Sequence, residues 1–207
     1  ISDLDGIPCQ AFLISLWALR LGSFLFMRVH KDGEDKRFRT IKPSATQFFM
    51  TWTLQGLWVS ICSMCALTAI SSESGIILNV FFYLGVAIFI LGFAIEIIAD
   101  NQKSKFRSIE ANKDSFITTG LWAKSRHPNY LGEILLWLGV AVISFSSLSG
   151  WQYLTLISPI FTYLLLVYVS GVRMLEERGE KKWGHNEEYI KYKSTTPRLF
   201  FNFVANF

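Results

Sequence analysis

The sequence is poor in charge and in cysteine, and it lacks the features that usually divide a chain into domains. Charged residues make up only 17% of its 207 residues, whereas hydrophobic residues make up 51%. This balance excludes an ordinary soluble domain of this length. The chain also has no low-complexity tract, no internal repeat and no linker rich in proline, glycine or serine. We therefore expect a single membrane domain over residues 1–207.

The few cysteines and histidines exclude two further classes of site. Cys9, Cys62 and Cys65 are too few for a disulfide framework. Cys62 and Cys65 lie in an apolar run, so their CxxC spacing favours helix packing over metal or redox chemistry. The three histidines are in different segments, and no HExxH motif is present. We expect no metal site.

Long apolar runs are the main feature of the sequence. A bilayer core of about 30 Å needs about 20 mostly apolar residues in a helix. Five runs meet this requirement, so we predict an all-α, polytopic transmembrane helix bundle. The spans are expected near residues 9–27, 48–70, 75–98, 130–149 and 152–172.

The basic residues indicate the orientation of these spans, because positively charged loops stay on the cytosolic side. Six Lys and Arg residues lie in 28–47, six in 99–129 and seven in the tail 173–207, which leaves only Arg20 inside a span. We predict that both loops and the tail are cytosolic. No nucleic-acid recognition motif accompanies the positive charge, so we expect no nucleic-acid partner.

The chain begins with Ile1, and no basic segment with a cleavage site precedes the first apolar run. We therefore expect no signal peptide and a fragment that lacks upstream sequence. A multi-pass chain of this kind is expected in a bacterial inner membrane or in the endoplasmic reticulum.

Polar residues inside the spans indicate a functional cavity. Four such residues lie at a similar depth near the cytosolic ends of separate spans; they are Arg20, Gln55, Glu96 and Glu133. Charged groups in a membrane are costly and usually face a polar cavity or a partner. The sequence thus predicts a polar chamber that opens to the cytosol. The alternative is that Arg20 pairs with a glutamate and only holds the bundle together.

Three polar stripes at helical spacing border this chamber. They consist of Glu96, Asp100, Lys103 and Arg107; of Asn129, Glu133 and Trp137; and of Arg173, Glu176, Glu177 and Glu180. Each stripe shares one helix face, and together they frame residues 125–130. This pattern favours a highly polar or anionic ligand. The chain has no GxGxxG after a strand and no GxxxxGK[ST], which excludes the familiar soluble nucleotide folds.

The run from Gly120 to Trp137, GLWAKSRHPNYLGEILLW, resembles the C-terminal domain of the steroid 5α-reductase superfamily. Further segments are similar to a poorly characterised branch of that superfamily. They are WALRLG at 17–22, GEDKRF at 33–38, LQGLWV at 54–59, ADNQK at 99–103, and the ending with Glu176-Glu177, Trp183-Gly184, Tyr189, Tyr192 and Thr196-Pro197.

The resemblance implies an enzyme that binds NADPH from the cytosolic side and reduces a carbon–carbon double bond conjugated to a carbonyl. Matched by position, the implied cofactor-binding residues are Arg20, Asp100, Arg107, Asn129, Glu133 and Arg173, with Arg126 and Tyr130 as neighbours in the motif. Guanidinium groups suit phosphates, whereas carboxylates and an amide suit ribose hydroxyls and a carboxamide.

Two departures from the family pattern bear on the substrate. Trp17 stands where the steroid reductases have a tyrosine that polarises the substrate carbonyl, and their glutamate on an earlier helix lies outside this chain. About two N-terminal spans are expected to be missing. These departures argue against a steroid-reducing site of the usual kind. An apolar bundle suits a lipid-like substrate, whether a sterol, an isoprenoid or an acyl chain.

Two other readings stay open. Membrane methyltransferases of the isoprenylcysteine carboxyl type also have an Arg-His-Pro-x-Tyr motif and a Glu-Glu stripe, and they use S-adenosylmethionine. A non-catalytic lipid-binding membrane protein is the second alternative.

The topology is testable by cysteine labelling in a background without the native cysteines. The variants Lys36→Cys, Lys113→Cys and Ile190→Cys should react with an impermeant reagent from the cytosolic side, because they lie in the basic segments. Glu73→Cys and Gly150→Cys should react only from the opposite side. Cytosolic labelling at position 73 would contradict the five-span arrangement.

Overall fold

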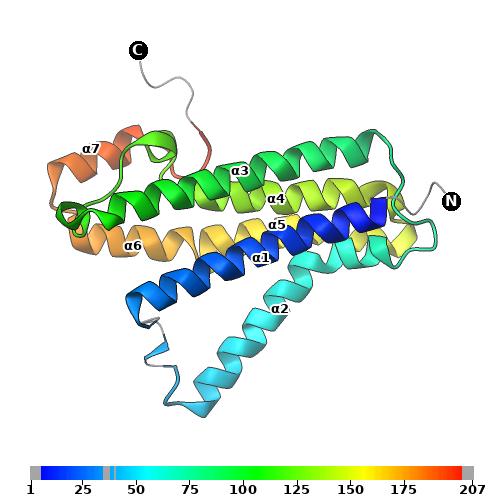
Figure 1. Cartoon of the computed structure of the whole chain (residues 1–207), viewed down its shortest axis with the longest axis horizontal. Helices are drawn as coiled ribbons and strands as arrows, with labels where there is room; N and C mark the ends of the chain where they lie inside the picture. The colour runs from blue at the N-terminus through cyan, green and yellow to red at the C-terminus, as the bar shows by residue number, and fades with distance from the viewer. Residues whose placement is uncertain (1–5, 35–37, 40, 202–207) are drawn as a thin grey trace. The chain divides into compact units, whose positions relative to one another are not determined.

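The computed structural model describes residues 6–34, 38, 39 and 41–201, without the side chain of Asp32. These residues form helices, turns and loops and contain no strand, which confirms the all-α prediction. The α-helices are α1 (Gly6–Asp32), α2 (Ala45–Ile70), α3 (Val80–Ser108), α4 (Pro128–Ser144), α5 (Ile157–Leu164), α6 (Val172–Trp183) and α7 (Glu187–Thr195) (Figure 1).

Five helical stretches within the described residues are long and apolar enough to cross a membrane. They are Gly6–Lys31, Ala45–Ile70, Val80–Ser108, Pro128–Ser147 and Gly150–Trp183. This confirms the prediction of a multi-pass integral membrane protein. The fifth stretch differs in detail from the continuous span expected over 152–172. It begins as a 3₁₀ helix (η6, Gly150–Leu156), continues as α5 and widens into a π turn (η7, Leu165–Val169) before α6 begins.

Side-chain caps and proline set several helix starts. Ser44 accepts a hydrogen bond from the backbone N–H of Gln47 at the start of α2. Asn79 accepts from the N–H groups of Phe81 and Phe82 at the start of α3. Pro128 is the first residue of α4, where its missing N–H costs nothing. These caps satisfy donors that the first turn of a helix leaves open.

The chain divides into two compact units, which are described separately. The first comprises Ile1–Tyr83 and Ala141–Ser158. A polar contact in its core links Gln10 to Ser144, with the amide donating to the hydroxyl at 2.8 Å. Cys62 and Cys65 form no disulfide among the described residues, and both are fully buried in this unit.

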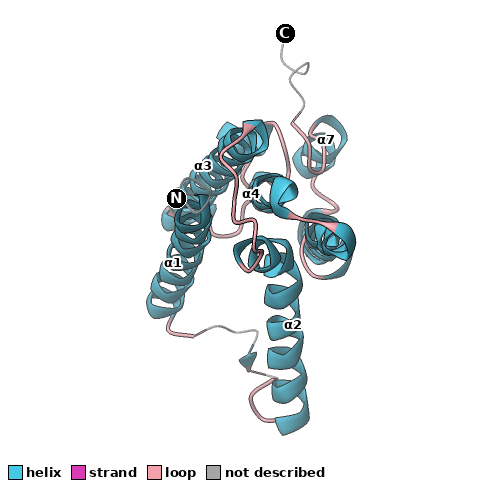
Figure 2. Cartoon of the chain, turned by 90° about the vertical axis from the view of Figure 1, so that its right-hand side faces the viewer, coloured by secondary structure: helices cyan, strands magenta, loops and turns pink. Residues whose placement is uncertain are grey.

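The second unit comprises Leu84–Val140 and Pro159–Phe207, and its core is a close backbone contact between α3 and α4. A Cβ atom added to Gly92 would lie 2.5 Å from the carbonyl oxygen of Gly132, and one added to Gly132 would lie 2.7 Å from the backbone nitrogen of Glu96. Seven residues further along α4, a Cβ on Gly139 would meet the nitrogen of Phe89 at 2.6 Å. The two helices lie side by side in both views (Figures 1 and 2).

The other side of α4 packs against the π turn and the C-terminal segment. Leu131 of α4, Val167 of η7 and Leu199 form a buried cluster, and Tyr130 packs at its edge. In the second unit α4 therefore contacts α3 on one side and η7 on the other, and its first turn is held in a fixed position.

Gly132→Ala should destabilise the protein by about 1–3 kcal/mol, because the new methyl group would overlap the backbone of α3. The matched control is Gly56→Ala, since a Cβ at Gly56 of α2 would have nothing within 4 Å. The control should leave stability unchanged or raise it slightly. Thermal unfolding of the purified variants in detergent measures both effects. Equal melting temperatures for the two variants would contradict the close contact.

Candidate functional site

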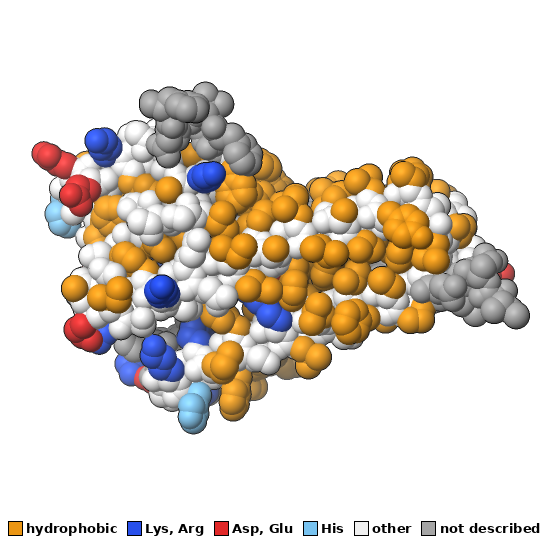
Figure 3. Space-filling view, turned by 45° about the horizontal axis from the view of Figure 1, so that its top comes forward, with side chains coloured by type: hydrophobic (Ala, Val, Ile, Leu, Met, Phe, Trp, Pro, Cys, Tyr) orange, Lys and Arg blue, Asp and Glu red, His pale blue; other side chains and the backbone are white. Residues whose placement is uncertain are grey.

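Polar side chains of the second unit gather at the end that the sequence predicts to be cytosolic. In Figure 3, charged side chains cluster around the end that carries α6 and α7, whereas apolar side chains cover the helices that run from it. The centre of this region is residues 120–127, which connect α3 to α4 through a 3₁₀ turn (η4, Gly120–Ala123).

The end of α3 fixes this connection by three contacts. The side-chain oxygen of Gln102 accepts the backbone N–H of Leu121 at 2.9 Å. The indole N–H of Trp122 donates to the carbonyl oxygen of Ala99 at 3.1 Å. The ammonium group of Lys103 lies 4.7 Å from the centre of the Trp122 ring, which is a cation–π distance. The position of α3 thus sets the position of the turn.

The C-terminal segment fixes the same connection from the other direction. The backbone N–H of Arg126 donates to the carbonyl oxygen of Pro197 at 3.0 Å. The hydroxyl of Ser125 donates to the carbonyl oxygen of Leu199 at 2.7 Å. Both bonds join groups more than 70 residues apart in the sequence, so the site forms only in the folded chain.

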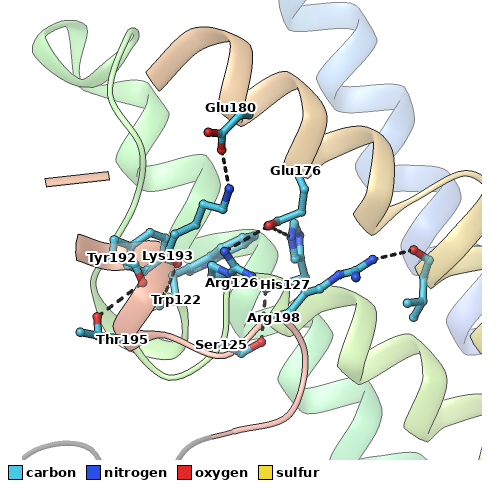
Figure 4. Close-up of polar contacts among 11 residues, drawn as sticks. Trp122, Ser125, Arg126, His127, Glu176, Glu180, Tyr192, Lys193, Thr195 and Arg198 are labelled. Atoms are coloured by element: carbon cyan, nitrogen blue, oxygen red, sulfur yellow. Dashed lines mark hydrogen bonds and ion pairs between the residues drawn. The ribbon is translucent and has the colours of Figure 1, made fainter. Parts of the chain in front are cut away.

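The carboxylate of Glu176 on α6 bridges two residues of the motif (Figure 4). Its Oε1 atom lies 2.7 Å from Nε2 of His127, and its Oε2 atom lies 3.1 Å from Nη1 of Arg126. The side chains of His127, Arg126 and Glu176 are only 7%, 12% and 20% exposed. Because a carboxylate only accepts hydrogen bonds, Nε2 of His127 carries the ring hydrogen and donates a hydrogen bond to Glu176.

Burial lowers the pKa of His127, and this effect outweighs the bond to Glu176, which acts in the opposite direction. The charges of Lys103 and Arg126 lower the pKa further. His127 is therefore neutral near pH 7, since its ordinary pKa of 6.5 is already below that value. The cluster holds one positive and one negative charge, which makes it neutral as a whole.

Three buried polar atoms of this region have no hydrogen-bond partner among the described residues. They are Nε and Nη1 of Arg126, the latter in ion-pair contact with Glu176, and Oδ1 of Asn129. The two residues are three positions apart, one just before α4 and one in its first turn. A donor and an acceptor left open in a buried place call for an explanation, and a bound polar ligand is one.

The residues predicted from the sequence to bind a cofactor lie in both units. Asp100 on α3 and Asn129, Tyr130 and Glu133 on α4 are half-buried in the second unit. The ring of Tyr130 packs on that of His127, with centres 6.0 Å apart. The structure thus brings the motif residues onto neighbouring elements, and their role in binding stays a prediction.

Three other predicted residues are placed differently. Arg107 is exposed near the end of α3. Arg173 is exposed on α6, where its Nε donates to Glu177 at 3.0 Å. Arg20 lies on α1 in the first unit, with its guanidinium 5.6 Å from the centre of the Phe24 ring. For Arg20, a contact with the motif residues stays a prediction.

Glu176 and His127 were not among the residues predicted to bind the cofactor. Both carried a signal: His127 belongs to the Ser125–Tyr130 motif, and Glu176 belongs to the third polar stripe. That stripe is also explained by a solvated helix end, and spacing along one helix does not show which distant residue it contacts. Only the fold pairs Glu176 with His127.

Comparison with known families gives a match over most of the chain. The model of the DUF1295 family, described as a protein of unknown function, matches residues 9–196. No curated protein and no solved structure matches the chain.

The neutral state of His127 predicts how stability depends on pH. Because the native pKa lies below the unfolded value of 6.5, the unfolded chain binds more protons in acid. The stabilisation is complete above about pH 6.5 and decreases as the pH falls below it. Thermal unfolding between about pH 7.5 and about pH 5.5 should show this loss, and His127→Gln should remove that part of it. An unchanged pH profile in the variant would show that the pKa of His127 is the same in the native and the unfolded protein, and would contradict this prediction.

Proposed function

We propose that this chain, which belongs to the DUF1295 family, is an NADPH-dependent membrane reductase of the steroid 5α-reductase superfamily. Its substrate would be a lipid-like molecule, a sterol, an isoprenoid or an acyl chain, with a carbon–carbon double bond conjugated to a carbonyl group. The reaction and the superfamily come from the sequence motif around His127. The support from the geometry concerns the binding of a polar cofactor.

The open atoms on Arg126 and Asn129 are the observation that carries the proposal. An ion pair that served only to hold α6 against the motif would use Arg126 Nη1 and Glu176, as the structure has it. It would give no reason for a buried Nε and a buried amide oxygen without partners. A ligand with both a hydrogen-bond acceptor and a donor satisfies both atoms. A dinucleotide has such groups in its phosphates and its carboxamide.

The residues of the second unit fit the parts of NADPH. Arg126 would bind a phosphate or a carboxamide oxygen, and the carboxylates of Asp100 and Glu133 would bind ribose hydroxyls. Asn129 would accept from the carboxamide NH₂ group. When bound, NADPH supplies the hydride for reduction of the double bond. The chain's part is to position cofactor and substrate and to keep water away.

Glu176 acts in this proposal as a positioning residue. It holds Nη1 of Arg126, and its other oxygen is held by the neutral His127. This ion pair keeps the guanidinium near α6, while Nε and Nη1 have no hydrogen-bond partner among the described residues. Because the cluster is neutral, attraction of an anionic cofactor depends on nearby lysines such as Lys103, which is half-buried beside Trp122.

The second candidate is a methyltransferase that uses S-adenosylmethionine. The contact of Glu176 with Arg126 and His127 favours the methyltransferase as much as the reductase. The Arg-His-Pro-x-Tyr motif and the Glu-Glu stripe occur in both classes. S-adenosylmethionine has no phosphate, and the basic residues around the site fit it less well. Binding of a lipid by a non-catalytic protein is the remaining alternative.

A binding experiment with purified protein in detergent tests the proposal. NADPH should raise the melting temperature, and should do so more than NADH, because the extra phosphate adds charge contacts. Asn129→Ala should weaken NADPH binding by about 1–3 kcal/mol, the range for losing a buried hydrogen bond. Asn101→Ala is the matched control, since Asn101 is exposed on α3, and its affinity should equal that of the unmodified chain.

Each other outcome selects a different function. Stabilisation by S-adenosylmethionine and not by NADPH would replace the reductase with the methyltransferase. Stabilisation by neither cofactor would leave lipid binding. Equal weakening by Asn129→Ala and Asn101→Ala would remove Asn129 from the cofactor site.

A further inference from the structure

A cavity of about 500 Å³ lies in the second unit, beside the cluster around Glu176. Its walls come from the loop after α3 and from the ends of α6 and α7. Three aromatic side chains line it, namely Phe116, Trp183 and Tyr192. None of the residues predicted or proposed to bind the cofactor lines this cavity.

The polar atoms of two of these aromatic residues are already engaged. The indole N–H of Trp183 donates to the carbonyl oxygen of Asp114 at 2.7 Å. The hydroxyl of Tyr192 donates to the carbonyl oxygen of Trp122 at 2.7 Å, and burial raises the pKa of this phenol. Phe116 packs against both rings, with centres 5.6 and 5.8 Å away. The aromatic residues are therefore fixed, and they offer ring surface to a ligand.

The rest of the lining is polar and of mixed charge. Thr118 and Thr195 contribute hydroxyl groups, and Glu188 and Lys191 contribute one charge of each sign. Asp114 is neutralised by Lys182, whose ammonium group lies 2.6 Å from its carboxylate. Flat aromatic walls with a rim of hydroxyls and the exposed ammonium group of Lys191 suit a flat, polar ring that carries a phosphate.

The length of the last candidate span favours a soluble ligand over a lipid head group. The last candidate span is 34 residues long, whereas about 20 residues cross the bilayer core. Roughly 14 residues, or about 20 Å of helix, extend beyond it. Trp183 ends this stretch. Because the basic tail predicts that this end is cytosolic, we expect the cavity to face water and to take a soluble ligand.

We propose that this cavity binds the adenosine part of the cofactor, with Lys191 near the adjoining phosphate. The adenine ring stacks on the aromatic walls, and the threonine hydroxyls bind its polar edge or the ribose. Tyr192 bonds to Trp122, which lies in the turn η4 that leads to Arg126, so the cavity borders the proposed cofactor site. The identity of the cofactor as NADPH rests on the proposed function. Adenosine itself is common to NADPH and S-adenosylmethionine, so a site for adenosine would serve either cofactor.

Two neighbouring residues on α7 give a matched pair of variants. Thr195 lines the cavity and Ser194 does not, and both are exposed and bond through their hydroxyls to the carbonyl oxygen of Lys191. Thr195→Trp should fill the cavity and weaken binding of 5′-AMP and of NADPH at least tenfold. Reduced nicotinamide mononucleotide, which lacks adenosine, should bind with unchanged affinity. Ser194→Trp should change none of the three affinities.

A second variant tests the phosphate contact without changing the shape of the cavity. Lys191→Glu reverses an exposed charge and should weaken 5′-AMP several-fold while leaving adenosine unchanged. Titration calorimetry in detergent measures all affinities, and the melting temperature of each variant checks its folding.

The outcomes separate this inference from the proposed function. Failure of 5′-AMP to bind the unmodified chain would overturn the inference, and so would NADPH binding that is unchanged in Thr195→Trp and in Lys191→Glu. Either result leaves the reductase proposal in place if NADPH still stabilises the protein. Binding of 5′-AMP and S-adenosylmethionine at the cavity, without binding of NADPH, would overturn the reductase and support the inference.

Discussion

The close backbone contact between α3 and α4 is the constraint on which the rest of the second unit depends. At Gly92, Gly132 and Gly139 a single methyl group would overlap the facing helix, so the two helices are locked in register. The end of α3 then places Trp122 through its bond to Ala99, and the start of α4 places Asn129. Because both helices enter the motif from opposite ends, a shift of either would separate the groups that the site combines. The glycines thus act on the site through the positions of the two helices.

The site is completed by parts of the chain that follow α4 by many residues. The π turn at 165–169 leaves the carbonyl oxygen of Val167 available, and the guanidinium of Arg198 donates to it at 3.1 Å. Arg198 thus ties the C-terminal segment to the break between α5 and α6. The same segment bonds to Ser125 and to the backbone of Arg126. One stretch of chain therefore fixes both the motif and the start of the helix that presents Glu176 to it.

The sequence predicted the fold better than it predicted the site, and the reason is physical. Length and hydropathy act locally, so each of the five spans could be recognised by itself. The break before α6 was not predicted, because no proline or charge marks it; only Gly171 stands there, and a Cβ at this glycine would lie 2.4 Å from the carbonyl oxygen of Leu166.

Within the site, the spacing of Asn129 and Glu133 is local and was recognised. The contact of Glu176 with His127 joins residues 49 positions apart, which no helical spacing reveals. Arg173 illustrates the opposite case, because a partner one turn away, Glu177, competes with any distant ligand.

The energetic balance of the site favours a ligand over a purely structural cluster. A buried ion pair contributes little or nothing to stability once the cost of removing its charges from water is counted. The ion pair of Arg126 and Glu176 therefore contributes little to holding α6 in place. His127 adds a further buried polar group. Each buried donor or acceptor left without a partner costs about 1–3 kcal/mol more, and Nε of Arg126 and Oδ1 of Asn129 are two such atoms. The polar groups are accounted for if a bound ligand offsets their cost, and that ligand must present a hydrogen-bond acceptor to the arginine and a donor to the asparagine.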